Sequence, residues 1–348
     1  MKRARIAGVL CACFIAAAAA GCGSAGSEKT MEGMQLIQQM DYEGAHASFE
    51  AAAANGEDMQ MICRGQGIAY MGQTDYANAV ENLEMALTYS GPVPEDLDYD
   101  INYYLASAYY RNGQLSEALG VYEAITALRP QEKTAWYLKG TIELEQGATE
   151  AAKADFDKAI EIDRTDFDQY VDIYRSCSKY GQETMGKEYL EAVLADESLR
   201  LSDYDKGRMY FYLGDYEQAR LSLESAKDFS GAEATSLLGQ TYENLGDYNY
   251  AASVYSTYLE TRQPDASIYN QLGICKLKVG DYTAALDAFQ AGLAIDGNTV
   301  MQSLQFNEIV AYEYLGQFEN AKIAMGQYLA LYPDDQKAQQ EYVFLQTR

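Results

Sequence analysis

The sequence holds few residues of the types that carry out catalysis. Its single histidine is His46, so a zinc site of the usual kind lacks a second histidine, and a Ser-His-Asp triad would have to use His46 as its base. No phosphate-binding or dinucleotide-binding glycine motif occurs. We therefore expect a protein that is not an enzyme and needs no cofactor, with His46 as a surface residue rather than a base.

The best candidate for a metal site is an alternating run of oxygen-bearing residues, Asp96, Asp98, Asp100 and Asn102. This run resembles the opening of a calcium-binding helix-loop-helix motif. Ile101 stands where that loop needs glycine, and Ser107 stands where it needs a bidentate glutamate. The sequence therefore predicts no metal site and interprets the run as the start of a helix.

The charge balance excludes one class of partner. The chain of 348 residues has 26 basic and 52 acidic residues, a formal net charge of -26. Such a chain lacks the basic surface that nucleic-acid binding requires. Hydrophobic residues make up 48% of the sequence, which is ample for a folded core. The acidity itself is typical of a well-solvated surface.

The N-terminus has the pattern of an export signal. Three basic residues, Lys2, Arg3 and Arg5, precede an apolar stretch over residues 6–20 that is short for a membrane span. Ala19-Ala20-Gly21 before Cys22 resembles the lipobox of bacterial lipoproteins, although Ala19 replaces the usual leucine. The resemblance implies a signal peptide over 1–21, a lipid on Cys22 and a flexible tether over 22–30. Ordinary cleavage after an Ala-x-Ala site is the alternative.

Self-similarity organises the rest of the chain. The segments from Tyr210, Tyr242 and Cys275 each contain glycine, a polar residue, tyrosine, then a small and a large residue at fixed spacing. Nine units align on this pattern and begin near residues 26, 60, 99, 133, 167, 200, 232, 266 and 302. Most of the spacings are close to 34 residues, and that period is typical of a repeated pair of helices.

Four positions agree across the units. Position 8 is small in seven of them: Gly33, Gly67, Ala106, Gly140, Gly207, Gly239 and Gly273. Position 20 is Ala45, Ala79, Ala118, Ala152, Gly186, Ala219, Ala251, Ala285 and Ala321. Position 24 is Phe49, Leu83, Tyr122, Phe156, Leu190, Leu223, Tyr255, Phe289 and Met325. Position 15 is glycine in the last seven units, where a left-handed residue can end the first helix.

This pattern resembles the tetratricopeptide repeat. The resemblance implies an all-α fold, a right-handed superhelical solenoid of about nine helical hairpins over residues 31–333. A capping helix over 334–348, begun by Asp334, would cover the last hairpin. The fifth unit has Tyr174 at position 8 and Gly186 at position 20, which predicts irregular packing there.

In the family that the pattern resembles, positions 2, 5, 9 and 12 of the first helices line a concave groove. Tyrosine and arginine are enriched at binding hot spots. The resemblance therefore implies a partner-binding groove made of these residues at such positions in the middle units: Tyr103, Tyr110, Tyr137, Arg175, Tyr204, Arg208 and Phe211. The alternative is that some of them pack against neighbouring helices instead.

These expectations combine into one function. We expect a non-enzymatic, extracytoplasmic scaffold in the bacterial cell envelope, attached to the membrane by a lipid on Cys22 and binding a protein or peptide. Two alternatives stay open: a structural or oligomerising envelope protein, and a cell-wall carbohydrate binder that uses the aromatic groove. Cys63, Cys177 and Cys275 are odd in number and about a hundred residues apart, so we expect no disulfide among them.

Overall fold

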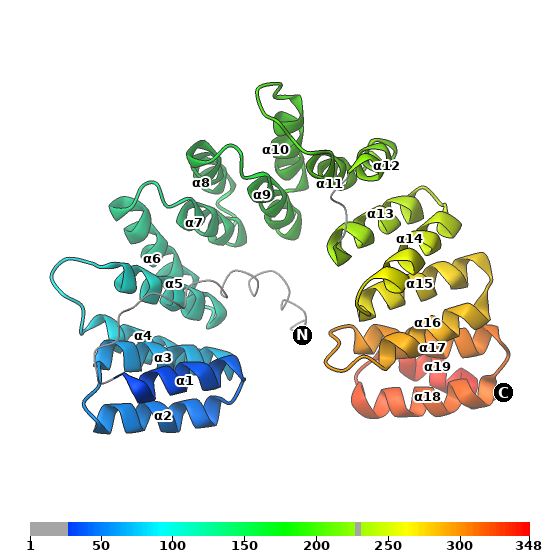
Figure 1. Ribbon diagram of the computed structural model, residues 1–348, viewed down its shortest axis with the longest axis horizontal. Helices are drawn as coiled ribbons and strands as arrows, with labels where there is room; N and C mark the ends of the chain where they lie inside the picture. Colours follow the sequence, from blue (N-terminus) through cyan, green and yellow to red (C-terminus); the bar gives the residue numbers. More distant parts are fainter. Residues whose placement is uncertain (1–26, 227–230) are drawn as a thin grey trace. The chain divides into compact units, whose positions relative to one another are not determined.

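The computed structural model describes residues 27–226 and 231–348, and every regular element in these residues is an α-helix. The helices follow one another as antiparallel pairs (Figure 1). In chain order they are α1 (Glu28–Gln38), α2 (Tyr42–Ala54), α3 (Met59–Gly72), α4 (Tyr76–Leu87), α5 (Asp96–Arg111), α6 (Leu115–Leu128), α7 (Lys133–Glu145), α8 (Thr149–Ile162), α9 (Phe167–Lys179), α10 (Glu183–Ala195), α11 (Asp203–Leu213), α12 (Tyr216–Ser225), α13 (Ala232–Asn244), α14 (Tyr248–Thr261), α15 (Ala266–Val279), α16 (Tyr282–Leu293), α17 (Met301–Tyr314), α18 (Phe318–Leu331) and α19 (Gln336–Leu345).

The predicted all-α repeat fold is confirmed. In the described part of the chain, nine hairpins, α1–α2 through α17–α18, are followed by the single helix α19. The first helix of each hairpin begins within three residues of its predicted start. The chain divides into two compact units, residues 1–163 and 164–348. Within the described residues, no helix is both long and apolar enough to span a bilayer.

Aspartates begin many of the second helices. The side chains of Asp41, Asp75, Asp215, Asp247 and Asp281 each accept a hydrogen bond from a backbone N–H three residues later. This satisfies an amide that has no partner inside the helix. The residue just before the loop is left-handed, as predicted, at Gly113, Gly147, Gly181, Gly214, Gly246, Gly280 and Gly316. In the first two hairpins the same position is Met40 and Thr74, both with φ 62°.

The two helices of a hairpin approach closely because position 8 is small. A methyl group on Gly273 would lie 2.3 Å from the Phe289 ring, and one on Gly239 would lie 2.1 Å from the Tyr255 ring. The position-24 side chains are all buried, and the position-20 alanines are fully buried. Position 24 thus fills the space that position 8 leaves empty, as the repeat pattern predicts.

The fifth hairpin, α9–α10, reverses this arrangement. Its large residue at position 8 is Tyr174, and its small residue is Gly186 on the second helix. A methyl group on Gly186 would lie 3.0 Å from the Tyr174 Cα atom. The predicted irregularity is therefore an exchange of roles between the two helices. The large residue lies on the first helix, and the glycine that allows the helices to approach closely lies on the second.

The structure corrects two predicted boundaries. The helix α1 begins at Glu28, so residues 28–30 are helical rather than part of a tether. The reason is a distant cap, because Glu57 accepts hydrogen bonds from the backbone N–H groups of Lys29 and Thr30 and from the Thr30 hydroxyl. At the other end, Asp335 rather than Asp334 caps α19. The predicted signal peptide and Cys22 lie outside the described residues.

The acidic run does start a helix, α5, as predicted. Asp98 accepts hydrogen bonds from the Gln60 amide and the Ser90 hydroxyl, and Asp100 pairs with Arg64 at 2.5 Å. Among the described residues, no group of three or more His, Cys, Asp and Glu side chains could hold a metal ion.

The thiols of Cys63, Cys177 and Cys275 are free and buried. Burial raises the pKa of Cys177 to about 12, so this thiol is a poor nucleophile at neutral pH. His46 is half-buried on α2, where its ring packs against Tyr70 with the centroids 4.3 Å apart.

Thr74→Gly should stabilise the protein. Thr74 is exposed and left-handed, a conformation that costs a non-glycine residue about 1–2 kcal/mol, whereas glycine adopts it freely. Part of this is offset by the greater chain entropy of unfolded glycine, so we expect a net stabilisation of about 0.5–1 kcal/mol in urea unfolding. Thr88→Gly is the matched control, because Thr88 has φ -68° and should lose stability. Destabilisation by both variants would contradict the argument.

Gly273→Ala should destabilise the protein by about 1–3 kcal/mol, because the added methyl group overlaps the buried Phe289 ring. Gly326→Ala on α18 is the control, since its new methyl group lies 3.6 Å from the nearest atom. Helix propensity alone predicts a gain of up to about 1 kcal/mol there. Thermal and urea unfolding measure the stability of both variants. Equal changes in stability would show that the close approach of the two helices does not require glycine at position 273.

Candidate binding face

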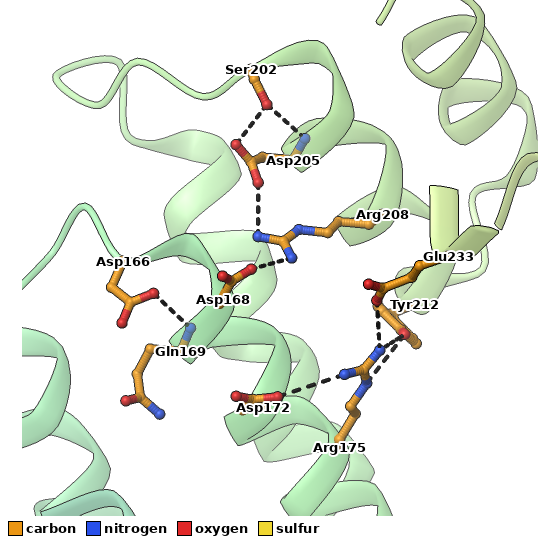
Figure 2. Close-up of polar contacts among 10 residues, drawn as sticks. All are labelled: Asp166, Asp168, Gln169, Asp172, Arg175, Ser202, Asp205, Arg208, Tyr212 and Glu233. Atoms are coloured by element: carbon orange, nitrogen blue, oxygen red, sulfur yellow. Dashed lines mark hydrogen bonds and ion pairs between the residues drawn. The ribbon is translucent and has the colours of Figure 1, made fainter. Parts of the chain in front are cut away.

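The second unit contains a cluster of charged side chains on the first helices of successive hairpins, which we call the arginine cluster (Figure 2). Helix α9 supplies Asp168, Asp172 and Arg175, α11 supplies Asp205, Arg208 and Tyr212, and α13 supplies Glu233. The three residues from α9 lie at i, i+4 and i+7, which places them on one face of that helix. Ser202 caps α11, and its hydroxyl also donates to Asp205 at 2.6 Å.

Arg208 lies in the interior of this cluster. Its side chain is only 11% exposed and donates hydrogen bonds to Asp168 and, at 2.7 Å, to Asp205. Burial opposes the charged form, but the hydrogen bond to Asp168 prevails and raises the pKa of Arg208. Two carboxylates therefore neutralise this guanidinium, and its contacts hold α9 and α11 together.

Arg175 has the same charge but different surroundings. Its side chain is 40% exposed, and its Nη2 and Nε atoms donate to the Tyr212 hydroxyl at 2.6 and 3.2 Å. Asp172 and Glu233 approach the guanidinium only to 3.6 and 3.7 Å, which is beyond hydrogen-bonding distance. Arg175 therefore keeps N–H groups available to an incoming acceptor, while Tyr212 fixes its orientation.

The other two predicted residues of this unit support the arginines. The Arg208 guanidinium lies 5.4 Å from the centroid of the Tyr204 ring. Phe211 packs edge-on against Tyr212 and Tyr216, with centroids 5.5 and 5.7 Å away. Both aromatic residues are half-buried. The structure thus brings together all four predicted residues of the second unit, with Arg175 the most exposed of them.

The three predicted tyrosines of the first unit lie on α5 and α7. Tyr103 has a buried hydroxyl group without a hydrogen-bond partner among the described residues, and burial raises its pKa. Tyr110 donates to Glu145 at 2.5 Å. The Tyr137 ring lies 6.0 Å from the ring of the buried Phe156. All three rings are half-buried, so they contribute to packing and still present part of their surface to solvent.

Sequence reasoning missed the partners of the arginines. Asp172 and Asp205 could have been found, because each lies three residues before its arginine. Asp168 could have been found as well, since it occupies position 2 of one repeat and Arg208 occupies position 9 of the next. Nothing in the repeat pattern marks Tyr212 or Glu233.

A shallow pocket of about 310 Å³ lies elsewhere, between α13 and α14. Its lining is rich in hydroxyl groups and includes none of the seven predicted residues: Thr235, Leu238, Tyr250, Ser253, Val254, Thr257, Tyr258, Thr261 and Arg262. The predicted residues lie outside this pocket, and Arg175 is the only one of them that is well exposed.

Models of the tetratricopeptide repeat match residues 64–132, 103–167, 204–267 and 236–298, and another model of this repeat matches residues 305–335. No curated protein matches the sequence.

Several solved structures match the chain at low identity. A tetratricopeptide repeat protein from Parabacteroides merdae is 17% identical, with 80% of this chain and 96% of that chain covered and a TM-score of 0.46. PilF from Pseudomonas aeruginosa is 20% identical, with coverages of 61% and 96% and a TM-score of 0.43. YrrB, described as having an unusual peptide-binding site, is 18% identical, with coverages of 63% and 96% and a TM-score of 0.36. Because the repeat models span more than half of the sequence, this chain belongs to the tetratricopeptide repeat family.

Proposed function

We propose that this protein is a lipid-anchored, extracytoplasmic scaffold that binds an acidic segment of a protein or peptide partner at Arg175. Tetratricopeptide repeat proteins are generally non-enzymatic scaffolds for protein–protein interaction, which supports the class of function. The observation that carries the proposal is the state of Arg175, a half-exposed guanidinium that Tyr212 orients and whose ion pairs with Asp172 and Glu233 are longer than hydrogen bonds.

The charge of the whole chain makes this residue selective. In a field set by a net charge of -26, an acidic ligand is repelled from most of the surface. It binds where cationic donors are available, and a guanidinium can hold a carboxylate through two parallel hydrogen bonds. Arg208 cannot serve in the same way, because Asp168 and Asp205 already accept its hydrogen bonds. The role of Arg208 is to hold the two helices that present Arg175 and Tyr212.

The aromatic residues would enlarge the contact. Half-buried tyrosines lose little conformational entropy on binding, and a well-packed anchor contributes about 2 kcal/mol or more. Tyr204 and Phe211 lie beside the arginine cluster, and Tyr103, Tyr110 and Tyr137 offer a similar surface in the first unit. We assign both sets of residues to partner binding, each set within its own unit.

The location in the cell envelope rests on the sequence. The basic start, the short apolar stretch and the small residues before Cys22 support export and lipidation. Residues 23–27, Gly-Ser-Ala-Gly-Ser, have the composition of a flexible linker, and α1 begins immediately after them.

Cys22→Ala should release the protein from the membrane fraction. One acyl chain binds a membrane only marginally, so the proposal requires a diacylated cysteine, and removing it abolishes anchoring. Fractionation and immunoblotting of cells that express each form measure the change, with Cys63→Ala as a control that keeps Cys22. A Cys22→Ala protein that stays in the washed membrane fraction would show that the anchor lies elsewhere.

Arg175→Ala should weaken binding of acidic peptides by about tenfold or more, measured on peptide arrays with Asp→Asn and Glu→Gln copies as neutral probes. Arg175→Lys should restore part of the affinity, because it keeps the charge but not the fork of donors. Tyr212→Phe should also weaken binding, since it removes the hydroxyl that orients the guanidinium.

The matched control is Arg220→Ala on α12, which removes one positive charge from a residue paired with Glu217 and Glu224. It should leave acidic-peptide binding unchanged. If Arg175→Ala and Arg220→Ala lost the same affinity for acidic peptides, the loss would be explained by the change in net charge alone. Unchanged binding in Arg175→Ala, with helicity preserved, would favour the structural or oligomerising alternative.

A further inference from the structure

Three charged side chains are buried together in the fourth hairpin, α7–α8. Lys139 and Glu143 lie on α7 and Asp155 lies on α8, and their side chains are 15%, 8% and 8% exposed. The Lys139 Nζ atom lies 2.9 Å from Asp155 Oδ2 and 3.7 Å from Glu143 Oε1. We call these three residues the lysine cluster.

The hydrogen bonds of the lysine cluster are incomplete by one donor. Two carboxylates face a single ammonium group, and only Asp155 is within hydrogen-bonding distance of it. Glu143 Oε2 is a buried atom without a hydrogen-bond donor, whereas Asp155 Oδ2 lies 2.9 Å from the Lys139 Nζ atom. A buried carboxylate oxygen without a donor is costly, and two carboxyl groups that face each other can both be satisfied by one shared proton.

We propose that Glu143 and Asp155 share one proton in the folded protein, and that loss of this proton loosens the α7–α8 hairpin. The lysine cluster is then a pH-sensitive element of the first unit. It belongs to the first unit, whereas the arginine cluster belongs to the second, and it does not require a bound partner to act.

The charges around the lysine cluster favour the protonated pair. Burial, followed by the hydrogen bond to Asp155, raises the pKa of Glu143 to about 7, and Glu123 on the neighbouring helix α6 adds to the rise, whereas Lys139 opposes it. The Trp136 ring, with its centroid 5.4 Å from Lys139 Nζ, helps to hold that ammonium group in place. From α5, the Tyr110 hydroxyl donates to Glu145 rather than to Glu143.

The direction of the pH effect follows from the raised pKa. The unfolded chain releases the Glu143 proton near pH 4.5, whereas the folded hairpin keeps it to about pH 7. The stabilisation is therefore complete below pH 4.5 and is lost as the pH rises through about 7. Tyr137 on α7 packs against Phe156 on α8, so loosening this hairpin also changes the surroundings of Tyr137. That this alters partner binding rests on the proposed function.

Hydrogen exchange of the full-length protein tests the proposal hairpin by hairpin. After correction for intrinsic exchange rates, protection of the α7–α8 amides should fall by about tenfold between pH 5.5 and pH 8. Glu143→Gln supplies a permanent donor in place of the proton, so its protection should stay constant over that range. A carbon-13 titration of the Glu143 carboxyl group should have its midpoint near pH 7.

Glu313→Gln provides the control, because burial also raises the pKa of Glu313, on α17, to about 7. This variant should keep the pH dependence of α7–α8 intact. An unfolding temperature for the whole chain would mix the two glutamates, whereas local exchange separates them. A Glu143 midpoint below pH 5, or the same pH dependence in Glu143→Gln as in the natural protein, would overturn the proposal. Neither result depends on the identity of a partner.

Discussion

Eight of the nine hairpins in the described residues depend on a close approach of their two helices, and the ninth has Ile309 at the corresponding position. In these eight, the backbone of one helix passes over a large buried side chain of the other, and the facing residue has almost no side chain. Phe289 lies beneath Gly273 in this way, and Phe156 lies beneath Gly140. The third hairpin combines Ala106 with Tyr122, so the limit on the facing residue is small size rather than glycine itself. The α9–α10 hairpin shows that the close approach can be supplied from either helix, because Gly186 there accommodates Tyr174.

This constraint explains why the fold could be predicted from the sequence. A contact that recurs with a period of about 34 residues requires similar residue types at the same position of every repeat. Each repeat alone is a weak indication, but nine aligned repeats make the pattern recognisable in the sequence. The left-handed glycines and the buried position-24 residues were predictable for this reason. Contacts that occur once leave no such pattern. The cap that Glu57 places on α1 joins residues nearly thirty positions apart and occurs once, so the helical state of residues 28–30 could not be predicted.

The candidate site falls between these two cases. The types of its residues could be predicted, because tyrosine and arginine stand at repeat positions that form one helix face. Their states could not, since burial and pairing depend on single partners. Arg175 and Arg208 occupy the same position in successive repeats. One is bound by two carboxylates and the other by a tyrosine hydroxyl, and this difference depends on Asp168 and Tyr212, which belong to particular repeats.

The buried charges therefore distinguish the repeats, whereas the apolar contacts make them alike. Burying a charge costs several kcal/mol of folding stability unless its partners are well placed. A buried charge therefore does not stabilise every repeat, and such groups occur only in particular hairpins. The lysine cluster lies in the hairpin α7–α8, and the arginine cluster links α9, α11 and α13. In the first cluster one ammonium group faces two carboxylates, so the carboxylate pair can accept a proton. In the second, Arg208 is buried and paired with two carboxylates, and Arg175 is left with hydrogen-bond donors for a carboxylate from outside. In both clusters, the imbalance between donors and acceptors determines what the site can bind.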